Sequence, residues 1–157
     1  MSEVTNMHAD LPRARVKRRL IAKALAFLAA ALTTLPADAE TVQENPGGQI
    51  VIFALHVAEL RAANEPVEFD GACDSACTLY LSLPAEQLCI TPRASFGFHL
   101  PYGVGAHENA IAAGYLISQY PDWVRLWIEE HGGLSHTIVR MEAAEAAKHL
   151  PLCGVLA

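Results

Sequence analysis

Residues 71–78 (GACDSACT) constrain the fold most, because two of the chain's four cysteines bracket a serine there. A short strand is predicted before this segment, at Pro66 to Phe69. The apolar stretch after it, Ser75 to Leu83, can form two helical turns and is stopped by Pro84. A serine at such a junction is either an ordinary helix N-cap in a disulfide knot or a nucleophile held at the start of a helix. Other segments of the sequence distinguish these two interpretations.

The N-terminal segment has the three parts of a secretory signal peptide. Six of the 11 basic residues lie between Arg13 and Lys23, an uncharged run from Ala24 to Leu35 follows, and PADAE ends at Glu40. This pattern predicts that residues 1–39 are a signal peptide, cleaved after Ala39. Spanning a bilayer takes ~20 apolar residues, so this run is short for an uncleaved anchor, which is the alternative. We therefore expect a periplasmic or secreted protein with no membrane association after cleavage.

The predicted mature chain, residues 40–157, is long enough for one domain with a modest core. It holds five basic and fourteen acidic residues, so its formal charge is −9. A surface of that sign repels phosphate backbones and anionic lipid, which argues against nucleic-acid and peripheral-membrane roles.

All four cysteines belong to this mature chain: Cys73, Cys77, Cys89 and Cys153. An even number of cysteines in an exported chain predicts disulfides, and four cysteines allow three connectivities, which stay open. Because no C-x-x-C pair is present, we expect no zinc site and no other metal.

Apolar and breaker residues predict alternating helices and short strands. Residues 49–63 are expected to form a mostly buried helix after a polar segment that ends in Pro-Gly-Gly. The remaining elements follow the same signals. They are strands at 66–69, 88–90 and 94–99, and helices at 75–83, 107–119, 121–131 and 135–148. The fold class is therefore α/β.

Four features in sequence order supply the parts of acyl-transfer catalysis: NPGG (45–48), GACDSACT (71–78), ASFGFHLP (94–101) and an acid-bearing C-terminal helix. A serine at a strand-to-helix junction exposes its hydroxyl near free backbone N–H groups, which stabilise negative charge. The N–H of Ala76 and a donor from the Gly47-Gly48 turn can bind an oxyanion. His99, at the end of a strand, can accept the serine proton.

These motifs resemble the ClpP/crotonase-like superfamily, and within it the Clp-type serine proteases. NPGG is similar to the family's Asn-Ser-Pro-Gly-Gly turn without its serine, and Ser75 stands at the nucleophile position. His99-Leu100-Pro101 stands at the position of the general base, 24 residues after the serine. The similar core runs from about Asn45 to Gly103, and the cysteine-rich variant resembles an exported bacterial subgroup.

The resemblance implies a spiral β-β-α fold, here N-terminally shortened, because the family's first strand-helix-strand portion does not precede NPGG in the mature chain. It also implies that Ser75 is the nucleophile, that His99 is the base, and that the N–H groups near Gly48 and Ala76 form the oxyanion hole. The family's third catalytic residue is an aspartate in the C-terminal helical region, but no aspartate follows Asp122 here. Glu145 is the expected substitute, with Glu142 or a Ser-His dyad as the alternatives.

An exported chain meets neither the ATP-driven unfoldases that feed Clp-type proteases nor coenzyme A thioesters. We therefore expect an ATP-independent hydrolase or peptidase that acts on peptides or small esters and amides, without a cofactor. The resemblance also implies a homo-oligomer. The alternative is a catalytically inactive member that serves as a scaffold or binding protein.

Overall fold

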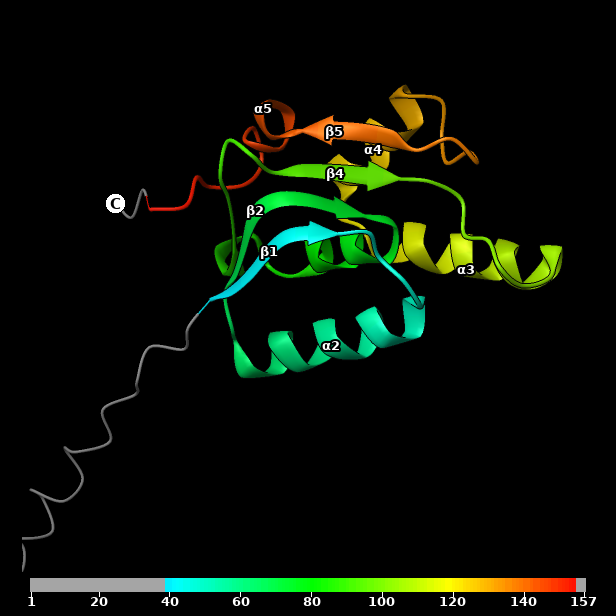
Figure 1. Ribbon diagram of the computed structural model, residues 1–157, viewed down its shortest axis with the longest axis horizontal. Coiled ribbons are helices and arrows are strands. Elements are labelled where there is room, and N and C mark those ends of the chain that lie inside the picture. The colour runs from blue at the N-terminus through cyan, green and yellow to red at the C-terminus, as the bar shows by residue number, and fades with distance from the viewer. Residues whose placement is uncertain (1–38, 155–157) are drawn as a thin grey trace, which may run out of the picture. The chain divides into compact units, whose positions relative to one another are not determined.

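The computed structural model describes residues 39–154, in which a five-stranded sheet is flanked by helices (Figure 1). The signal peptide predicted at residues 1–39 lies, apart from Ala39, outside the described residues. The elements in chain order are β1 (Glu40–Asn45), α2 (Ile50–Ala63), β2 (Val67–Asp74), η2 (Ser75–Ser82), η3 (Ala85–Gln87), β3 (Leu88–Ile90), β4 (Ser95–Phe98), α3 (Ala106–Gln119), α4 (Asp122–Glu130), β5 (Val139–Glu142) and α5 (Ala143–Ala146). This alternation confirms the predicted α/β class.

Strand β2 is the centre of the sheet, whose order is β1-β2-β4-β5. One edge of β2 pairs in parallel with β1. Its other edge pairs in parallel with β3 along residues 67–69 and with β4 along residues 72–74. The last strand, β5, is antiparallel to β4. The carboxyl ends of β1, β2 and β4 therefore meet at one end of the sheet, where parallel α/β sheets commonly bind ligands.

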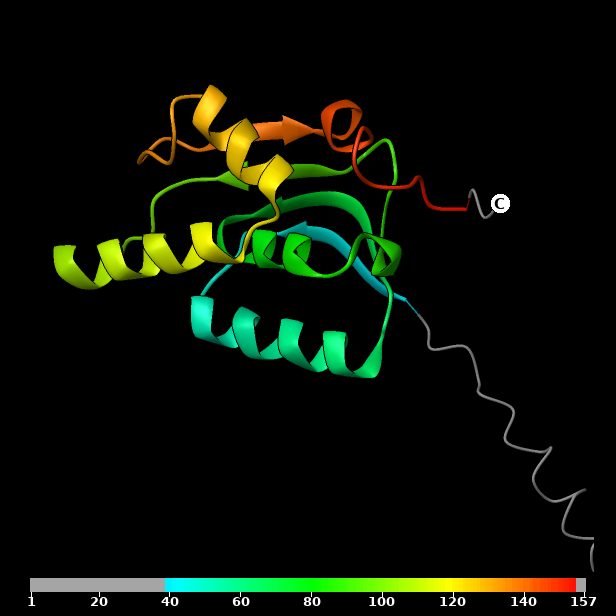
Figure 2. The ribbon, with the colours of Figure 1, turned by 180° about the vertical axis from the view of Figure 1, so that it is seen from behind.

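The core lies on one face of the sheet. Side chains along β2 alternate, so that Val67, Phe69 and Cys73 are buried while Asp70 and Asp74 are half-buried on the opposite face. The helices η2, α3 and α4 lie behind the sheet in Figure 1 and in front of it in Figure 2, so they cover the same face. The other face is the polar one.

Helix α2 confirms the helix predicted at residues 49–63, but the expectation that it is mostly buried was wrong. Val57 and Leu60 are buried, whereas Val51, Ile52 and Leu55 are 58–61% exposed. The reason is positional, because α2 follows the edge strand β1 and packs against η2 on one side only (Figure 1).

Two other elements differ from the sequence prediction. The polar segment that starts at Glu40 forms the strand β1, because its backbone completes the hydrogen bonds along one edge of β2. The helix predicted at residues 135–148 is wrong for its first half. Residues 139–142 form β5 with Met141 in the core, and α5 is only four residues long. A short apolar stretch can form either a helix or a strand, and here pairing with β4 makes residues 139–142 a strand.

The helices at 75–83, 107–119 and 121–131 are confirmed, although the first of them is a 3₁₀ helix rather than an α-helix. No helix within residues 39–154 combines the length and the apolar character that a membrane crossing requires.

Candidate active site

Ser75 occupies the turn between β2 and η2, and its backbone lies in the left-handed region with φ 57°. Asp74 before it is extended, with φ −109° and ψ 156°. A non-glycine residue in a sparsely populated backbone region costs of order 1–3 kcal/mol, and such residues cluster at functional sites. A sharp strand-to-helix turn of this kind exposes a serine hydroxyl at the end of a sheet, where a nucleophile can reach its substrate.

The first interpretation of the sequence, in which Ser75 is the N-cap of the following helix, is wrong. The capping residue of η2 is Asp74, and no side chain makes a capping hydrogen bond at this helix. Ser75 is instead the first residue of η2 and lines a cleft. Its hydroxyl therefore has no structural function as a cap that would compete with chemistry.

Two links hold this turn, which we call the elbow (residues 73–78). A disulfide joins Cys73 to Cys77 across Ser75, and both cysteines are fully buried. The Thr78 hydroxyl donates to the Ser75 carbonyl at 2.6 Å and lies 2.6 Å from the Tyr120 hydroxyl. The single hydroxyl proton of Thr78 goes to the Ser75 carbonyl, so the Tyr120 hydroxyl is the donor to Thr78. Burial raises the pKa of Tyr120 to about 12. The Ser75 peptide is thus fixed from the core side.

The Pro-Gly-Gly turn after β1 lies directly against the elbow. A Cβ on Gly47 would lie 2.5 Å from the Asp74 carbonyl oxygen and from Ser75 Cβ, and 2.9 Å from the Ala76 nitrogen. Gly47 also has φ 83°, so both the space and the backbone angle require glycine. The Gly47 N–H donates to Asn45 Oδ1 at 2.9 Å.

Of the two predicted oxyanion donors, Gly48 lines the cleft beside Ser75, whereas Ala76 is fully buried and is not among the residues that line it. Within residues 39–154 the Gly48 N–H makes no backbone hydrogen bond in a turn, loop or cap. Ala76 is the second residue of η2, and the first N–H groups of a helix have no acceptor within the helix. Gly47, and not Gly48, is the residue of the turn that lies against the Ala76 nitrogen.

His99 follows the last residue of β4. Its Nδ1 lies 2.7 Å from the Leu100 carbonyl oxygen, and the Leu100 N–H donates to the Ser135 carbonyl at 2.7 Å. A carbonyl can only accept, so Nδ1 carries the proton in this contact and Nε2 of the neutral ring is left as the acceptor. The ring also packs against Tyr102, with centroids 5.6 Å apart. The backbone thus sets the tautomer that a general base needs.

Ser75 and His99 line the same cleft, which has a volume of about 710 Å³. The other walls are residues 46–50, the loop 101–104 and one side of α3. Among residues 39–154, no Lys, Arg, Asp or Glu lines this cleft. Within the described part of the chain no hydrogen bond joins Ser75 Oγ to His99, and such contacts commonly form only once substrate is bound.

Glu145, the expected acid, is not brought to this cleft. It lies in α5, pairs with Lys148 at 2.5 Å, and lines a different pocket with Trp123 and His149. The other candidate, Glu142, pairs across the sheet with Ser95, four residues before His99. Four residues of strand span roughly 13 Å. The segment that runs beside His99 is residues 134–139 (LSHTIV), which contains no carboxylate.

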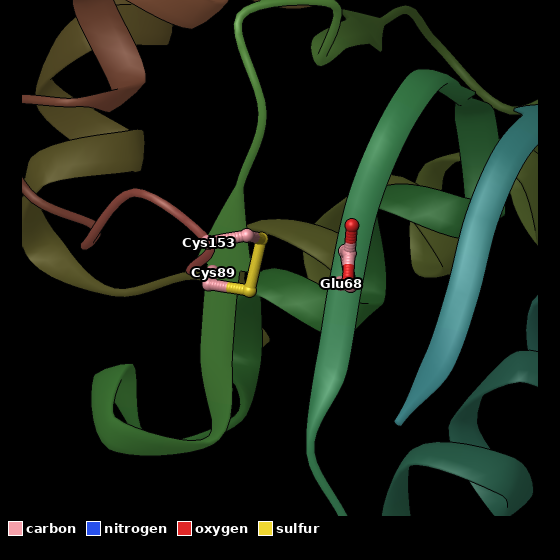
Figure 3. A group of neighbouring side chains, drawn as sticks. All are labelled: Glu68, Cys89 and Cys153. Atoms are coloured by element: carbon pink, nitrogen blue, oxygen red, sulfur yellow. A yellow bond between two sulfur atoms is a disulfide. The ribbon is translucent and has the colours of Figure 1, made fainter. Parts of the chain in front are cut away.

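The four cysteines form two disulfides, Cys73–Cys77 and Cys89–Cys153. Cys89 and Cys153 also lie beside Glu68 on the neighbouring strand, so that three potential metal ligands fall within 4.8 Å of one another (Figure 3). Metals bind cysteine as the thiolate. Because these two sulfur atoms are bonded to each other, the group does not fit a metal in this form.

Asp74 and Arg140 were not predicted as functional residues, although Asp74 stands next to Ser75 in the sequence. Arg140 reaches Asp74 from β5 with two hydrogen bonds of 2.9 Å. The charge of Asp74 beside Ser75 indicated that a basic residue should lie nearby. The partner of Asp74 could not be found because residues 135–148 were predicted to be helical.

In the comparisons with known proteins, only solved structures match this chain. No family model matches the chain, and no curated protein does. Among solved structures the chain is similar to a mutant of ClpP1 from Listeria monocytogenes, with 22% sequence identity and a TM-score of 0.44. That similarity covers 69% of this chain and 67% of the other.

Proposed function

We propose that this chain is an exported serine hydrolase of the ClpP/crotonase-like type, in which Ser75 is the nucleophile and His99 the general base. One observation carries the proposal. A strained, left-handed Ser75 opens into a cleft that His99 and Gly48 also line. The order β1-α2-β2-η2-β4 and the glycine turn against the elbow agree with the spiral fold that the motifs suggest.

In the proposed reaction, Nε2 of His99 takes the hydroxyl proton of Ser75 as Oγ attacks the substrate carbonyl carbon. The carbonyl oxygen becomes an oxyanion that accepts hydrogen bonds from the N–H groups of Gly48 and Ala76. His99 then returns the proton to the leaving amine or alcohol as the scissile bond breaks, which leaves an acyl group on Ser75.

Water completes the cycle through the same groups. His99 removes a proton from a water molecule, the hydroxide attacks the acyl carbon, and the same two N–H groups stabilise the second oxyanion. Collapse of this intermediate releases the carboxylic acid, and the proton on His99 returns to Ser75 Oγ. The cycle needs no metal or cofactor to balance.

The proposed site is a dyad, the alternative to Glu145 and Glu142 that the sequence left open. The Leu100 carbonyl accepts a hydrogen bond from Nδ1–H of His99 and so performs the orienting part of an acid's function. A neutral carbonyl stabilises an imidazolium less than a carboxylate does, so we expect slower turnover than a full triad would give.

The cleft indicates the chemical class of the substrate. With no Lys, Arg, Asp or Glu among the described residues that line it, the cleft offers no ion-pair partner for a charged substrate group. Its volume of about 710 Å³ is within the usual range for small-molecule sites. Peptides with uncharged side chains and small neutral esters or amides are therefore the proposed substrates.

Export is supported by the two disulfides, because such bonds persist in oxidising compartments. Strand β1 begins at Glu40, so cleavage after Ala39 would leave each described element intact. The exposed apolar residues of α2, Val51, Ile52 and Leu55, are consistent with a homo-oligomer.

The test is labelling of the oxidised, folded protein with a fluorophosphonate, which reacts with activated serines. We expect the wild type to be labelled, Ser75→Ala to remain unlabelled, and His99→Ala to react at least about 100-fold more slowly. Glu145→Gln separates dyad from triad, since a dyad predicts a change of less than about twofold and a triad a loss of about 100-fold or more.

An unlabelled wild type with intact disulfides would overturn the hydrolase proposal. It would favour the second candidate, a non-catalytic scaffold. The observation behind that candidate is the lack of any carboxylate in the segment beside His99.

A further inference from the structure

Three residues in one row of the sheet connect the elbow to β5. Asp74 of β2 pairs with Gly97 of β4, and Gly97 pairs with Arg140 of β5. Asp74 and Arg140 are thus two strands apart, yet their side chains meet across the intervening glycine. Both carboxylate oxygens of Asp74 accept hydrogen bonds from the guanidinium, each at 2.9 Å. A two-pronged contact of this kind fixes direction as well as distance.

Gly97 is what allows this contact. A Cβ at position 97 would overlap Asp74 Oδ1 and the side chain of Ile138. The guanidinium of Arg140 also donates a hydrogen bond to Ser95 Oγ of β4 at 3.0 Å. The side chains of Asp74 and Arg140 are 19% and 35% exposed, so water only partly screens the pair.

The Asp74–Arg140 ion pair lies on the polar side of the elbow, opposite the disulfide and the Thr78 hydrogen bond. The Cys73–Cys77 disulfide and Thr78 hold Ser75 from the core, whereas Asp74 points to the polar face of the sheet. A strained residue persists only where its surroundings fix it from several directions. The residue before Ser75 is fixed by its side chain, and the residues after it are fixed by the disulfide and by Thr78.

Arg140 also neutralises a local excess of negative charge. The carboxylates of Glu142 and Glu44 lie near enough to act on its guanidinium, in addition to Asp74. Without Arg140, the Asp74 carboxylate would lose its cationic partner and the two hydrogen bonds that fix its side chain next to Ser75.

We propose that Arg140 is a positioning residue, which holds the Ser75 nucleophile in its reactive geometry through Asp74. The inference rests on the proposed hydrolase function for its kinetic consequences. Its structural part, that Arg140 keeps the elbow rigid, does not depend on activity. Arg140 itself is not among the residues that line the cleft, so it acts through Asp74.

The same sheet face provides a matched control. Arg93 pairs with Asp70, which lies four residues before Asp74 on the same face of β2. Arg93→Ala therefore breaks an arginine–aspartate pair of β2 without touching the elbow. A general weakening of the sheet would appear in both variants, whereas loss of positioning would appear only in Arg140 variants.

Three measurements test the proposal on Arg140→Ala, Arg140→Lys and Arg93→Ala. They are the fluorophosphonate labelling rate, kcat and KM for a neutral p-nitrophenyl ester, and hydrogen exchange of the amides of residues 75–78. Small displacements of a catalytic group cost up to about 100-fold. We expect Arg140→Ala to lower the labelling rate and kcat by about 10- to 100-fold, with KM changed less than about twofold.

Arg140→Lys keeps the charge but loses the planar fork, so it should recover part of the rate. Exchange at residues 75–78 should accelerate at least about tenfold in Arg140→Ala and stay unchanged in Arg93→Ala. Equal losses in both alanine variants, or an unchanged elbow in folded Arg140→Ala, would overturn the proposal. If the wild type is not labelled, the hydrolase function fails, and the exchange measurement still decides whether Arg140 holds the elbow.

Discussion

The two ends of β2 are fixed by different kinds of links. At the carboxyl end, the Cys73–Cys77 disulfide joins residues four positions apart, and Thr78 bonds back to Ser75. At the amino end the links join distant segments. The Cys89–Cys153 disulfide closes a loop of 64 positions beside Glu68 (Figure 3), and Glu40 of β1 reaches His56 and Tyr80 at 2.6 and 2.7 Å.

This difference separates the stability of the domain from the geometry of its site. A disulfide that closes a longer loop restricts the unfolded chain more, which gives ~4 kcal/mol for the long loop and ~2 kcal/mol for the short one. The short loop holds a backbone angle that the chain would otherwise relax. We therefore expect changes at the amino end to lower stability and spare the site, and changes at the carboxyl end to impair the site more than stability.

The largest effect on stability is expected from the double variant Cys89→Ala/Cys153→Ala. It should lower the free energy of unfolding by ~4 kcal/mol, because the unfolded chain is no longer restricted by this long loop. Urea denaturation measures the loss. Fluorophosphonate labelling of the folded fraction should stay within about twofold of the wild type, and a loss of labelling equal to that of Cys73→Ala/Cys77→Ala would contradict the separation of the two ends.

Gly47→Ala should come next and act on the site. The substitution combines a left-handed backbone, worth ~1–2 kcal/mol, with an overlap against Asp74 and Ser75. We expect a loss of ~3 kcal/mol and no detectable labelling. Gly132→Ala is the matched control, since Gly132 has φ 92°, has nothing within 4 Å of its added Cβ and does not line the cleft. The control should show the backbone cost alone, and similar losses in both variants would refute the contact.

The double variant Cys73→Ala/Cys77→Ala should lower the free energy of unfolding by only ~2 kcal/mol. Its effect on labelling should be larger than that small loss suggests, with a rate reduced about tenfold or more, because the left-handed Ser75 loses its main constraint. Both cysteines are buried, so alanine is preferred to serine, whose hydroxyl would lack a partner. A labelling rate equal to that of the wild type would show that Thr78 and Asp74 suffice.

The smallest effect concerns pH at the amino end. Burial alone would lower the pKa of His56, but the hydrogen bonds and charges of Glu40 and Glu59 outweigh it and raise the pKa above 6.5. A raised pKa in the folded state stabilises the protein below the unfolded value, and this contribution disappears as the pH rises through the folded value. For a pair this exposed the contribution is ~0.5 kcal/mol.

The measurement is the unfolding free energy of the wild type and of His56→Gln at pH 6 and at pH 8.5. The difference between the two proteins should be larger at pH 6, and labelling at a given pH should be the same for both. A stability difference that does not change with pH would show that the Glu40 link does not depend on the histidine charge.

The fold class and most elements could be predicted, because helices α2, α3 and α4 and strand β3 carry strong local patterns. The two missed strands lie at or beside the edges of the sheet. β1 is polar on most positions, and β5 has only four residues, so pairing with a neighbour rather than local sequence determines both. Such long-range pairing is not visible in a single sequence.

For the candidate site, motif order selected Ser75, His99 and Gly48, which line one cleft, whereas the predicted donor Ala76 is fully buried and does not line it. Their catalytic roles stay predictions. The acid failed to reach them because Glu145 was placed on a helix beginning at residue 135, whereas β5 carries the chain away from His99 before α5 begins. The ion pair of Asp74 with Arg140 was hidden for the same reason.

The acceptor that orients His99 is the main-chain oxygen of residue 100. Every amino acid supplies that oxygen, so no side-chain replacement at this position can delete it. In the proposed enzyme a point mutation could therefore remove the nucleophile, the base or the ion pair of Arg140 with Asp74. It could not remove the main-chain oxygen that selects the tautomer of His99. Proline is the exception at position 100, because it would keep this oxygen but lose the N–H that donates to the Ser135 carbonyl.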